Sequence, residues 1–358
     1  MALSNPVQLA LCWLFENPLN IRGVCGIIRD YASWFQGAYN KTIYTNALAN
    51  TTFIALPNGR LATGARDGAV RIWDVSSGGC LLTLAGHTGG VWVLAALSDG
   101  TLASGSWDKT VRVWDTNTGA CLTLVGHAST VSALAVLSDS KLASGSYDST
   151  VRVWNTNTRA CLTLVGHAST VSALAVLRDG KLASGSYDST VRVWDTNTGA
   201  CLLILTGHTG MVTTLAALMD GKMASGSYDR TVRVWDTDTG ACLILTGHTS
   251  TVCTLAVLMD GRLASGSVDN MVRVWDSSNT GACLTLAGHT SSVCTLAVLS
   301  DGNLASGSYD MTVRVWDTNT GACLLTLEGH TSVVWTLALT SDSKLASGSS
   351  NRFIFIWH

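Results

Sequence analysis

Residues 121–160 read CLTLVGHASTVSALAVLSDSKLASGSYDSTVRVWNTNTRA, and residues 161–200 repeat this stretch with few changes. The two copies differ only at Ser138/Arg178, Ser140/Gly180, Asn155/Asp195 and Arg159/Gly199. The same unit recurs every 40 or 41 residues, and each copy carries one anchor tryptophan: Trp73, Trp114, Trp154, Trp194, Trp235, Trp275, Trp316 and Trp357. Self-similarity at a fixed period of this length indicates a repeat architecture, so one unit decides the fold of most of the chain.

Within one unit the apolar residues recur with a period of two, which predicts short β-strands. Three predicted strands are 131–137, 142–146 and 150–154, joined by tight turns. A fourth runs over 161–165, after the polar loop 155–159. Such a thin unit cannot bury both of its faces alone. Copies stacked face to face in a closed ring can do so.

The run of Gly-His, Leu-Ala-Ser-Gly-Ser-Tyr-Asp and Val-Arg-Val-Trp-Asp resembles the WD-repeat family of β-propellers, over about residues 41–358. The resemblance implies an all-β ring of four-stranded blades around a central channel, used as a binding platform. The last copy ends at Trp357-His358 without a fourth strand, whereas Lys41–Tyr44 aligns with the fourth-strand segments. We therefore expect eight blades, the last completed by Lys41–Tyr44. A seven-bladed ring with a leftover copy is the alternative.

The composition restricts the classes of partner. The chain has 358 residues, of which 47% are hydrophobic and 13% charged; an average soluble domain is about 25% charged. Such a chain can bury a large core, which excludes disorder. The net charge of −2 lacks the excess of positive charge that is typical of proteins that bind nucleic acid or an acidic membrane surface. No apolar run approaches the roughly 18 residues of a transmembrane helix.

Seven of the eleven cysteines occupy one repeated place, namely Cys80, Cys121, Cys161, Cys201, Cys242, Cys283 and Cys323. No Cys-x-x-Cys occurs, so neither a zinc site nor a redox site is predicted. We expect small buried side chains in an intracellular, cytoplasmic protein. No cofactor and no metal is predicted. The absence of Lys or Arg before residue 22 makes 7–15 a poor signal-peptide core.

Each of six units carries one His, one Ser, one Asp and one Trp at constant spacing. The sets are His87/Ser104/Asp108/Trp114, His127/Ser144/Asp148/Trp154, His167/Ser184/Asp188/Trp194, His208/Ser225/Asp229/Trp235, His248/Ser265/Asp269/Trp275 and His289/Ser306/Asp310/Trp316. Seen once, His with Ser and Asp would suggest nucleophilic catalysis. Six occurrences favour a scaffold, because an enzyme needs one site. The resemblance implies a hydrogen-bonded chain from Asp through His and Ser to the indole N–H.

The terminal units depart from this pattern. The first has Asn46 in place of His and Thr63 in place of Ser, and the last has Asn351 in place of Asp beside His330 and Ser347. We expect both terminal units to be less firmly tied, as terminal repeats often are. No Walker-type Gly-x-x-x-x-Gly-Lys-Ser/Thr and no EF-hand ligand pattern is present.

If the scaffold is uniform, partner binding should lie where the repeat pattern is broken. Two sets of positions project from loops that the resemblance places at the channel mouth. The candidate binding residues among them are Arg66, Trp92, Trp107, Tyr147, Tyr187, Tyr228, Tyr309 and Trp335. Aromatic and arginine side chains often carry interface energy; alternatively, the tyrosines cover the Asp–His pairs beneath them. The departures Arg178, Arg230, Arg262 and Arg352 are explained by a solvated surface.

Residues 1–38 are predicted to be a helical extension before a propeller over 39–358. Pro6 and Pro18 mark two helix starts, and apolar residues recur at helical spacing over 21–35. A short helical module with a Val-Cys pair before a propeller looks slightly like an F-box, which would imply a substrate receptor of a ubiquitin ligase. The sequence favours a monomeric, non-enzymatic scaffold that binds other proteins or peptides, with 1–38 available for self-association. The alternatives are the F-box-like receptor and an enzyme with a site in the central channel.

Overall fold

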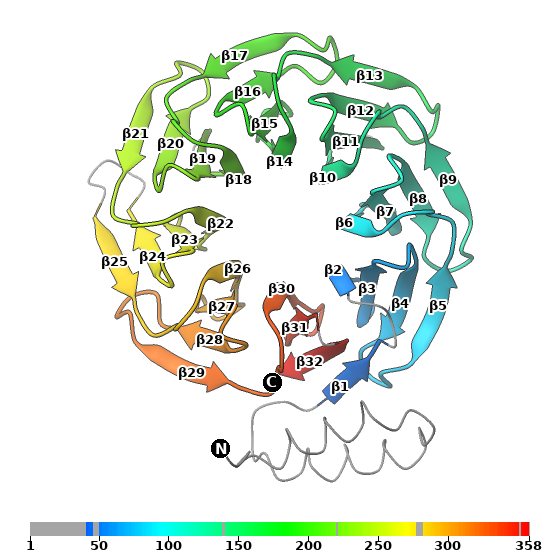
Figure 1. The fold of residues 1–358 in the computed structure, drawn as a ribbon. Coiled ribbons are helices and arrows are strands. Elements are labelled where there is room, and N and C mark those ends of the chain that lie inside the picture. The colour runs from blue at the N-terminus through cyan, green and yellow to red at the C-terminus, as the bar shows by residue number, and fades with distance from the viewer. Residues whose placement is uncertain are drawn as a thin grey trace, which may run out of the picture.

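A computed structural model describes residues 41–45, 50–137, 140–219, 221–276, 282–350 and 352–357. Within these ranges the chain forms 32 strands in eight four-stranded antiparallel sheets. Figure 1 shows the sheets as blades around a central opening. The expected eight blades are confirmed, and the seven-bladed alternative is wrong. The predicted helices of residues 1–38 and their F-box likeness lie outside the described residues.

Each blade is numbered here in chain order. Blades 1 to 3 contain β2 Asn50–Leu56, β3 Arg60–Ala65, β4 Val70–Asp74 and β5 Cys80–Leu84; β6 Val91–Ala96, β7 Thr101–Ser106, β8 Val111–Asp115 and β9 Cys121–Leu124; and β10 Val131–Val136, β11 Lys141–Ser146, β12 Val151–Asn155 and β13 Cys161–Leu164. Blades 4 and 5 contain β14 Val171–Val176, β15 Leu182–Ser186, β16 Val191–Trp194 and β17 Cys201–Leu205; and β18 Val212–Ala217, β19 Lys222–Ser227, β20 Val232–Asp236 and β21 Cys242–Leu245.

Blades 6 to 8 complete the ring. They contain β22 Val252–Val257, β23 Leu263–Ser267, β24 Val272–Trp275 and β25 Cys283–Leu286; β26 Val293–Val298, β27 Leu304–Ser308, β28 Val313–Trp316 and β29 Cys323–Leu327; and β30 Val334–Leu339, β31 Leu345–Ser349, β32 Phe353–Trp357 and β1 Lys41–Tyr44. In each blade the first strand lies nearest the central opening and the last strand lies on the perimeter (Figure 1). The predicted strand bounds of the third unit agree with the structure to within about one residue.

The N-terminal strand β1 closes the ring. It pairs antiparallel with β32, with Lys41 opposite Ile356 and Tyr44 opposite Phe353, as the sequence predicted. Ile43 is fully buried and packs in a cluster with Phe53 of blade 1 and residues of blade 8. The first and last strands of the chain therefore share one sheet and one core.

The hydrophobic core lies between neighbouring blades. One cluster joins Val153 and Leu164 of blade 3 to Val171 and Trp194 of blade 4. Gly145 on β11 belongs to the same seam, since a Cβ there would lie 2.7 Å from Cγ1 of Val171. Each blade thus buries one face against the next, which is why a single copy could not fold alone.

The repeated cysteines lie on the perimeter, and the expectation that they are buried is wrong. Cys80, Cys121, Cys161, Cys201, Cys242, Cys283 and Cys323 are all exposed and free. Each begins an outermost strand, which has a neighbouring strand on only one side, so its side chain is not covered as those of the inner strands are. An arginine of the adjacent strand lies beside six of the seven thiols, all but Cys80; Arg112 Nη1, for example, is 3.4 Å from Cys121 Sγ.

We call one side of the ring the loop face. It is formed by the Gly-His loops between blades and by the turns between the second and third strands of each blade. The two are joined by backbone hydrogen bonds, such as the one from Tyr147 N–H to the Thr130 carbonyl at 2.9 Å. None of the described residues forms a helix long and apolar enough to cross a membrane.

Candidate functional site

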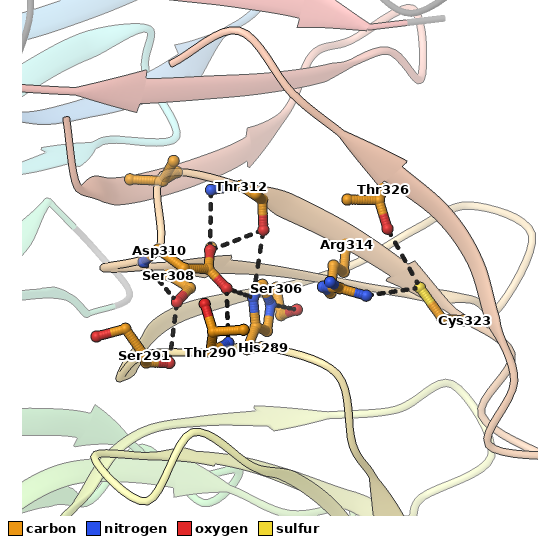
Figure 2. Close-up of polar contacts among 12 residues, drawn as sticks. His289, Thr290, Ser291, Ser306, Ser308, Asp310, Thr312, Arg314, Cys323 and Thr326 are labelled. Carbon is orange, nitrogen blue, oxygen red and sulfur yellow. Dashed lines mark hydrogen bonds and ion pairs between the residues drawn. The ribbon is translucent and has the colours of Figure 1, made fainter. Parts of the chain in front are cut away.

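The His, Ser, Asp and Trp of one blade, here called a tetrad, are linked by hydrogen bonds. In blade 7, Trp316 Nε1 donates to Ser306 Oγ at 2.8 Å, and Ser306 Oγ lies 2.7 Å from His289 Nε2. His289 Nδ1 lies 2.8 Å from Asp310 Oδ2. Asp310 also accepts the backbone N–H of Thr290 at 3.0 Å (Figure 2). The tetrad therefore ties the loop before blade 7 to its second and third strands.

These bonds are all satisfied when the imidazole is neutral. The Ser306 hydroxyl accepts from the indole and donates to Nε2, which leaves Nδ1–H of His289 to donate to Asp310. Burial lowers the pKa of His289 below its ordinary 6.5 and outweighs the opposing effect of Asp310. Burial also acts to raise the pKa of Asp310, but hydrogen bonds from Thr312, Thr290 and His289 outweigh it and hold that pKa at about 2.

The same geometry occurs in all six complete tetrads. The His–Asp separations are 2.7 or 2.8 Å, as are the His–Ser and Trp–Ser separations, for the sets His87/Ser104/Asp108/Trp114, His127/Ser144/Asp148/Trp154, His167/Ser184/Asp188/Trp194, His208/Ser225/Asp229/Trp235, His248/Ser265/Asp269/Trp275 and His289/Ser306/Asp310/Trp316. Each of these six blades therefore has the same chain of hydrogen bonds, which supports the scaffold interpretation.

The serines of these tetrads lie at the centre of the network and are completely enclosed. The fully buried serines, each 0% exposed, are Ser104, Ser144, Ser184, Ser225, Ser265 and Ser306. A catalytic serine beside His and Asp would need an accessible site, and the burial of these serines agrees with the scaffold interpretation instead. A substrate or a partner cannot reach a side chain that has no exposed surface. These serines are core residues that hold the blade together, and a binding site has to lie elsewhere.

The terminal units keep part of the tetrad. In blade 1 the indole of Trp73 donates to Thr63 Oγ1 at 2.9 Å, while Asp67 pairs with Arg71 at 2.7 Å. In blade 8 His330 Nε2 lies 2.7 Å from the Oγ of Ser347. Asn46 and Asn351, two of the three departures in these units, lie outside the described residues.

Five blades carry an aromatic side chain on the loop face, one residue before the turn aspartate. Trp107, Tyr147, Tyr228 and Tyr309 are exposed, as is Arg66 at the equivalent place in blade 1, whereas Tyr187 is half-buried. The other two blades carry Val268 and Ser350 here. All the candidate binding residues of this set thus lie on one side of the ring, in the turns that hold the tetrad aspartates.

Two tryptophans of blade 2 form a cluster with an arginine of blade 1. The rings of Trp92 and Trp107 lie 6.0 Å apart, measured between centroids. The guanidinium of Arg66 lies 6.0 Å from the Trp107 ring, which is within cation–π distance. Trp92 is 41% and Trp107 43% exposed, so both indoles are held in place and remain accessible.

A second aromatic cluster joins blades 7 and 8. Tyr309 meets Trp335 edge to face, with ring centroids 4.9 Å apart. Trp335 Nε1 donates to Ser350 Oγ at 2.8 Å, and the indole is 41% exposed. The sequence placed Trp335 and Tyr309 on the same face, but it did not show that they touch.

Four of the five small residues that replace Trp92 and Trp335 in other blades hydrogen-bond to the next blade, namely Ser132, Ser172, Thr213 and Cys294. Ser132 Oγ donates to the carbonyl of Val171, and Thr213 Oγ1 donates to that of Val252 at 2.6 Å. Sequence reasoning missed these links. The only sign of these links in the sequence is a serine or threonine at a strand position next to the channel. An apolar residue is equally common at such a position, so the hydroxyl by itself did not indicate a link.

Comparison with known proteins identifies a family and a solved structure of similar fold. The family model described as "WD domain, G-beta repeat" matches residues 47–74, 78–115, 119–155, 159–195, 199–236, 241–276, 282–317 and 321–358. The crystal structure of Ika8, a computationally designed protein, is similar at 35% sequence identity with a TM-score of 0.82. The match covers 90% of this chain and 100% of Ika8. No curated protein matches the chain.

Proposed function

The chain belongs to the WD40-repeat family, and on that premise we propose that it is a non-enzymatic scaffold that binds other proteins or peptides on its loop face. WD40 propellers typically serve as platforms for protein interaction, and the eight-bladed ring supplies a rigid one. The tetrads hold the loops in place and leave the neighbouring aromatic residues to contact the partner. Within the described residues no three His, Cys, Asp or Glu side chains are grouped as a metal site requires.

One observation carries this proposal: three large indoles are exposed on one face where the repeat pattern is broken. Trp92, Trp107 and Trp335 are each more than 40% exposed, although burial of an indole is strongly favourable. Hydrogen bonding and ring contacts fix their orientation, so little side-chain entropy would be lost on binding. Exposed, ordered aromatic side chains of this kind are typical of interface hot spots.

The proposal extends to the compartment and to the first residues. The nine described cysteines are free thiols, which supports a reducing, cytoplasmic location. We propose that residues 1–38 are an extension separate from the propeller of 39–358.

Proximity labelling in cells tests the proposed face. The chain fused to a labelling enzyme is compared with Trp107→Ala/Trp335→Ala and with Leu325→Ala, which removes an equally exposed apolar side chain from the perimeter strand β29. We expect a set of neighbours that the double variant loses and Leu325→Ala retains, with both variants melting close to the parent. An unchanged neighbour set in the double variant would refute the proposed face. A version lacking 1–38 shows whether any neighbour depends on that segment.

A further inference from the structure

Cationic side chains gather on one sector of the loop face. Blades 8, 1 and 2 are consecutive in the ring, since β2 packs between β30 and β6 (Figure 1). Arg66 lies in the turn of blade 1, Lys109 in that of blade 2 and Arg352 in that of blade 8. The positions equivalent to Lys109 in blades 3 and 4 are Ser149 and Ser189, which carry no charge.

The carboxylates of this sector are largely occupied. Asp67 pairs with Arg71 at 2.7 Å, and Asp108 accepts hydrogen bonds from His87 and from Thr88. Exposed Glu328, two residues before His330, is the one further carboxylate in the described part of the loop face of blades 8, 1 and 2. Within the described residues none of Arg66, Lys109 and Arg352 is paired with a carboxylate. Arg71 offsets the charge of Asp67, and the ionised Asp108 side chain is only 7% exposed. The accessible charge of the sector is therefore mainly positive, although the chain as a whole is net negative.

The cations lie beside the exposed indoles. Arg66 contacts the Trp107 ring, and Lys109 follows Trp107 by two residues in the same turn. Arg352 follows Ser350 by two residues, and Ser350 holds the indole of Trp335. Trp107 thus has one cation on its ring and another two residues along its turn, and the serine that holds Trp335 has a cationic residue two positions along.

We propose that this sector, defined by Arg66, Trp92, Trp107, Lys109, Trp335 and Arg352, binds an acidic peptide segment that carries at least one bulky apolar side chain. The proposal rests on the proposed function and names its ligand class. Carboxylates complement the unpaired cations, and the apolar side chain contacts the indole faces. The opposite side of the loop face lacks this combination, because blade 5 offers Arg230 beside Tyr228 but has no tryptophan on its loops.

Selection of short random peptides displayed on phage, with the full chain as bait, tests the inference without a known partner. We expect the enriched peptides to be net negative and to share an aromatic or large aliphatic residue. Their affinity should fall at least about 30-fold with Trp107→Ala, as for a hot spot. It should fall roughly threefold with Lys109→Ala, as for a rim charge, and weaken as salt is added.

Arg230→Ala is the matched control, because Arg230 occupies in blade 5 the turn position that Lys109 occupies in blade 2. It should leave peptide affinity unchanged. Melting of each variant checks that the fold is intact, and Arg66→Gln/Lys109→Gln serves as a second variant in case Trp107→Ala is unstable. The proposed sector would be refuted if the enriched peptides were neutral or basic. It would also be refuted if their affinity responded to Arg230→Ala and not to the sector variants. Either result would leave the loop face as a binding surface. No enrichment of any peptide would count against the proposed function itself.

Discussion

Replacing Ser306 by alanine removes one oxygen atom and leaves two buried groups without their partner. The indole N–H of Trp316 loses its acceptor at 2.8 Å, and His289 Nε2 loses its donor at 2.7 Å. Ser306 and Trp316 are fully buried, and His289 is 5% exposed, so water does not replace the hydroxyl. Each stranded group costs about 1–3 kcal/mol. Because the two share one network their costs are not fully additive, and we expect a total of about 3 kcal/mol.

Denaturant unfolding, followed by tryptophan fluorescence and by circular dichroism, measures this loss. Ser300→Ala is the matched control, since it makes the same substitution in the same blade at an exposed turn position. The control should stay within about 0.5 kcal/mol of the parent. If Ser306→Ala unfolds at the same denaturant concentration as Ser300→Ala, the tetrad does not stabilise the blade and the reasoning is refuted.

Acidification probes the tetrads, and two further substitutions probe the packing between blades and the closure of the ring. Stability should fall as the pH drops below about 6.5, because burial lowers the pKa of His289 in the folded state and the unfolded chain therefore binds more protons. A second loss of stability should come below pH 3.8, because the pKa of Asp310 is about 2 in the folded state. Thermal melts across pH test this, and a flat profile between pH 7 and 5 would contradict it. Gly145→Ala should destabilise by about 1–3 kcal/mol, because its Cβ would lie 2.7 Å from a methyl of Val171; an unchanged melting temperature would argue against close blade packing. Ile43→Asp should open the ring between blades 8 and 1, seen as increased proteolysis near residues 353–357, whereas Lys41→Asp, half-buried on the same strand, should do so much less.

The architecture could be predicted because the same pattern is repeated eight times. Lys41–Tyr44 was recognised as the closing strand by its likeness to the fourth-strand segments, and the pairing with Phe353–Trp357 confirms that inference. The spacing of His, Ser, Asp and Trp likewise follows from period-two strands and short turns. Each tetrad needs only contacts between residues at most 21 apart in sequence, as between His289 and Asp310, so local register is enough to predict it.

The burial of the tetrad serines was expected from the resemblance and could not be predicted from residue type alone. Serine is mostly exposed in folded proteins. Here the opposite holds, because the middle strands of each blade are covered on both faces by neighbouring blades, and the serines that are 0% exposed for this reason are Ser104, Ser144, Ser184, Ser225, Ser265 and Ser306. The hydroxyl is tolerated in that position because the indole and the imidazole satisfy it.

Several features that depend on the completed ring escaped prediction. Cys121 looks like a core residue by composition, but it is exposed because its strand is the outermost one. The Ser132–Val171 link joins different blades, and its donor is a residue type equally common in turns. The contact of Trp335 with Tyr309 requires the spacing of two neighbouring blades, which only the closed eight-fold ring sets.

Amide hydrogen exchange of the segment Lys41–Tyr44 tests most directly whether the first strand closes the last blade and so fixes the binding face. In the intact chain, peptides that cover 41–44 should exchange as slowly as those that cover another perimeter strand, such as Cys161–Leu164, because both are paired on one side. Exchange of 41–44 at the rate of an unstructured peptide, with 353–357 unprotected as well, would show that the ring is open and would contradict the account.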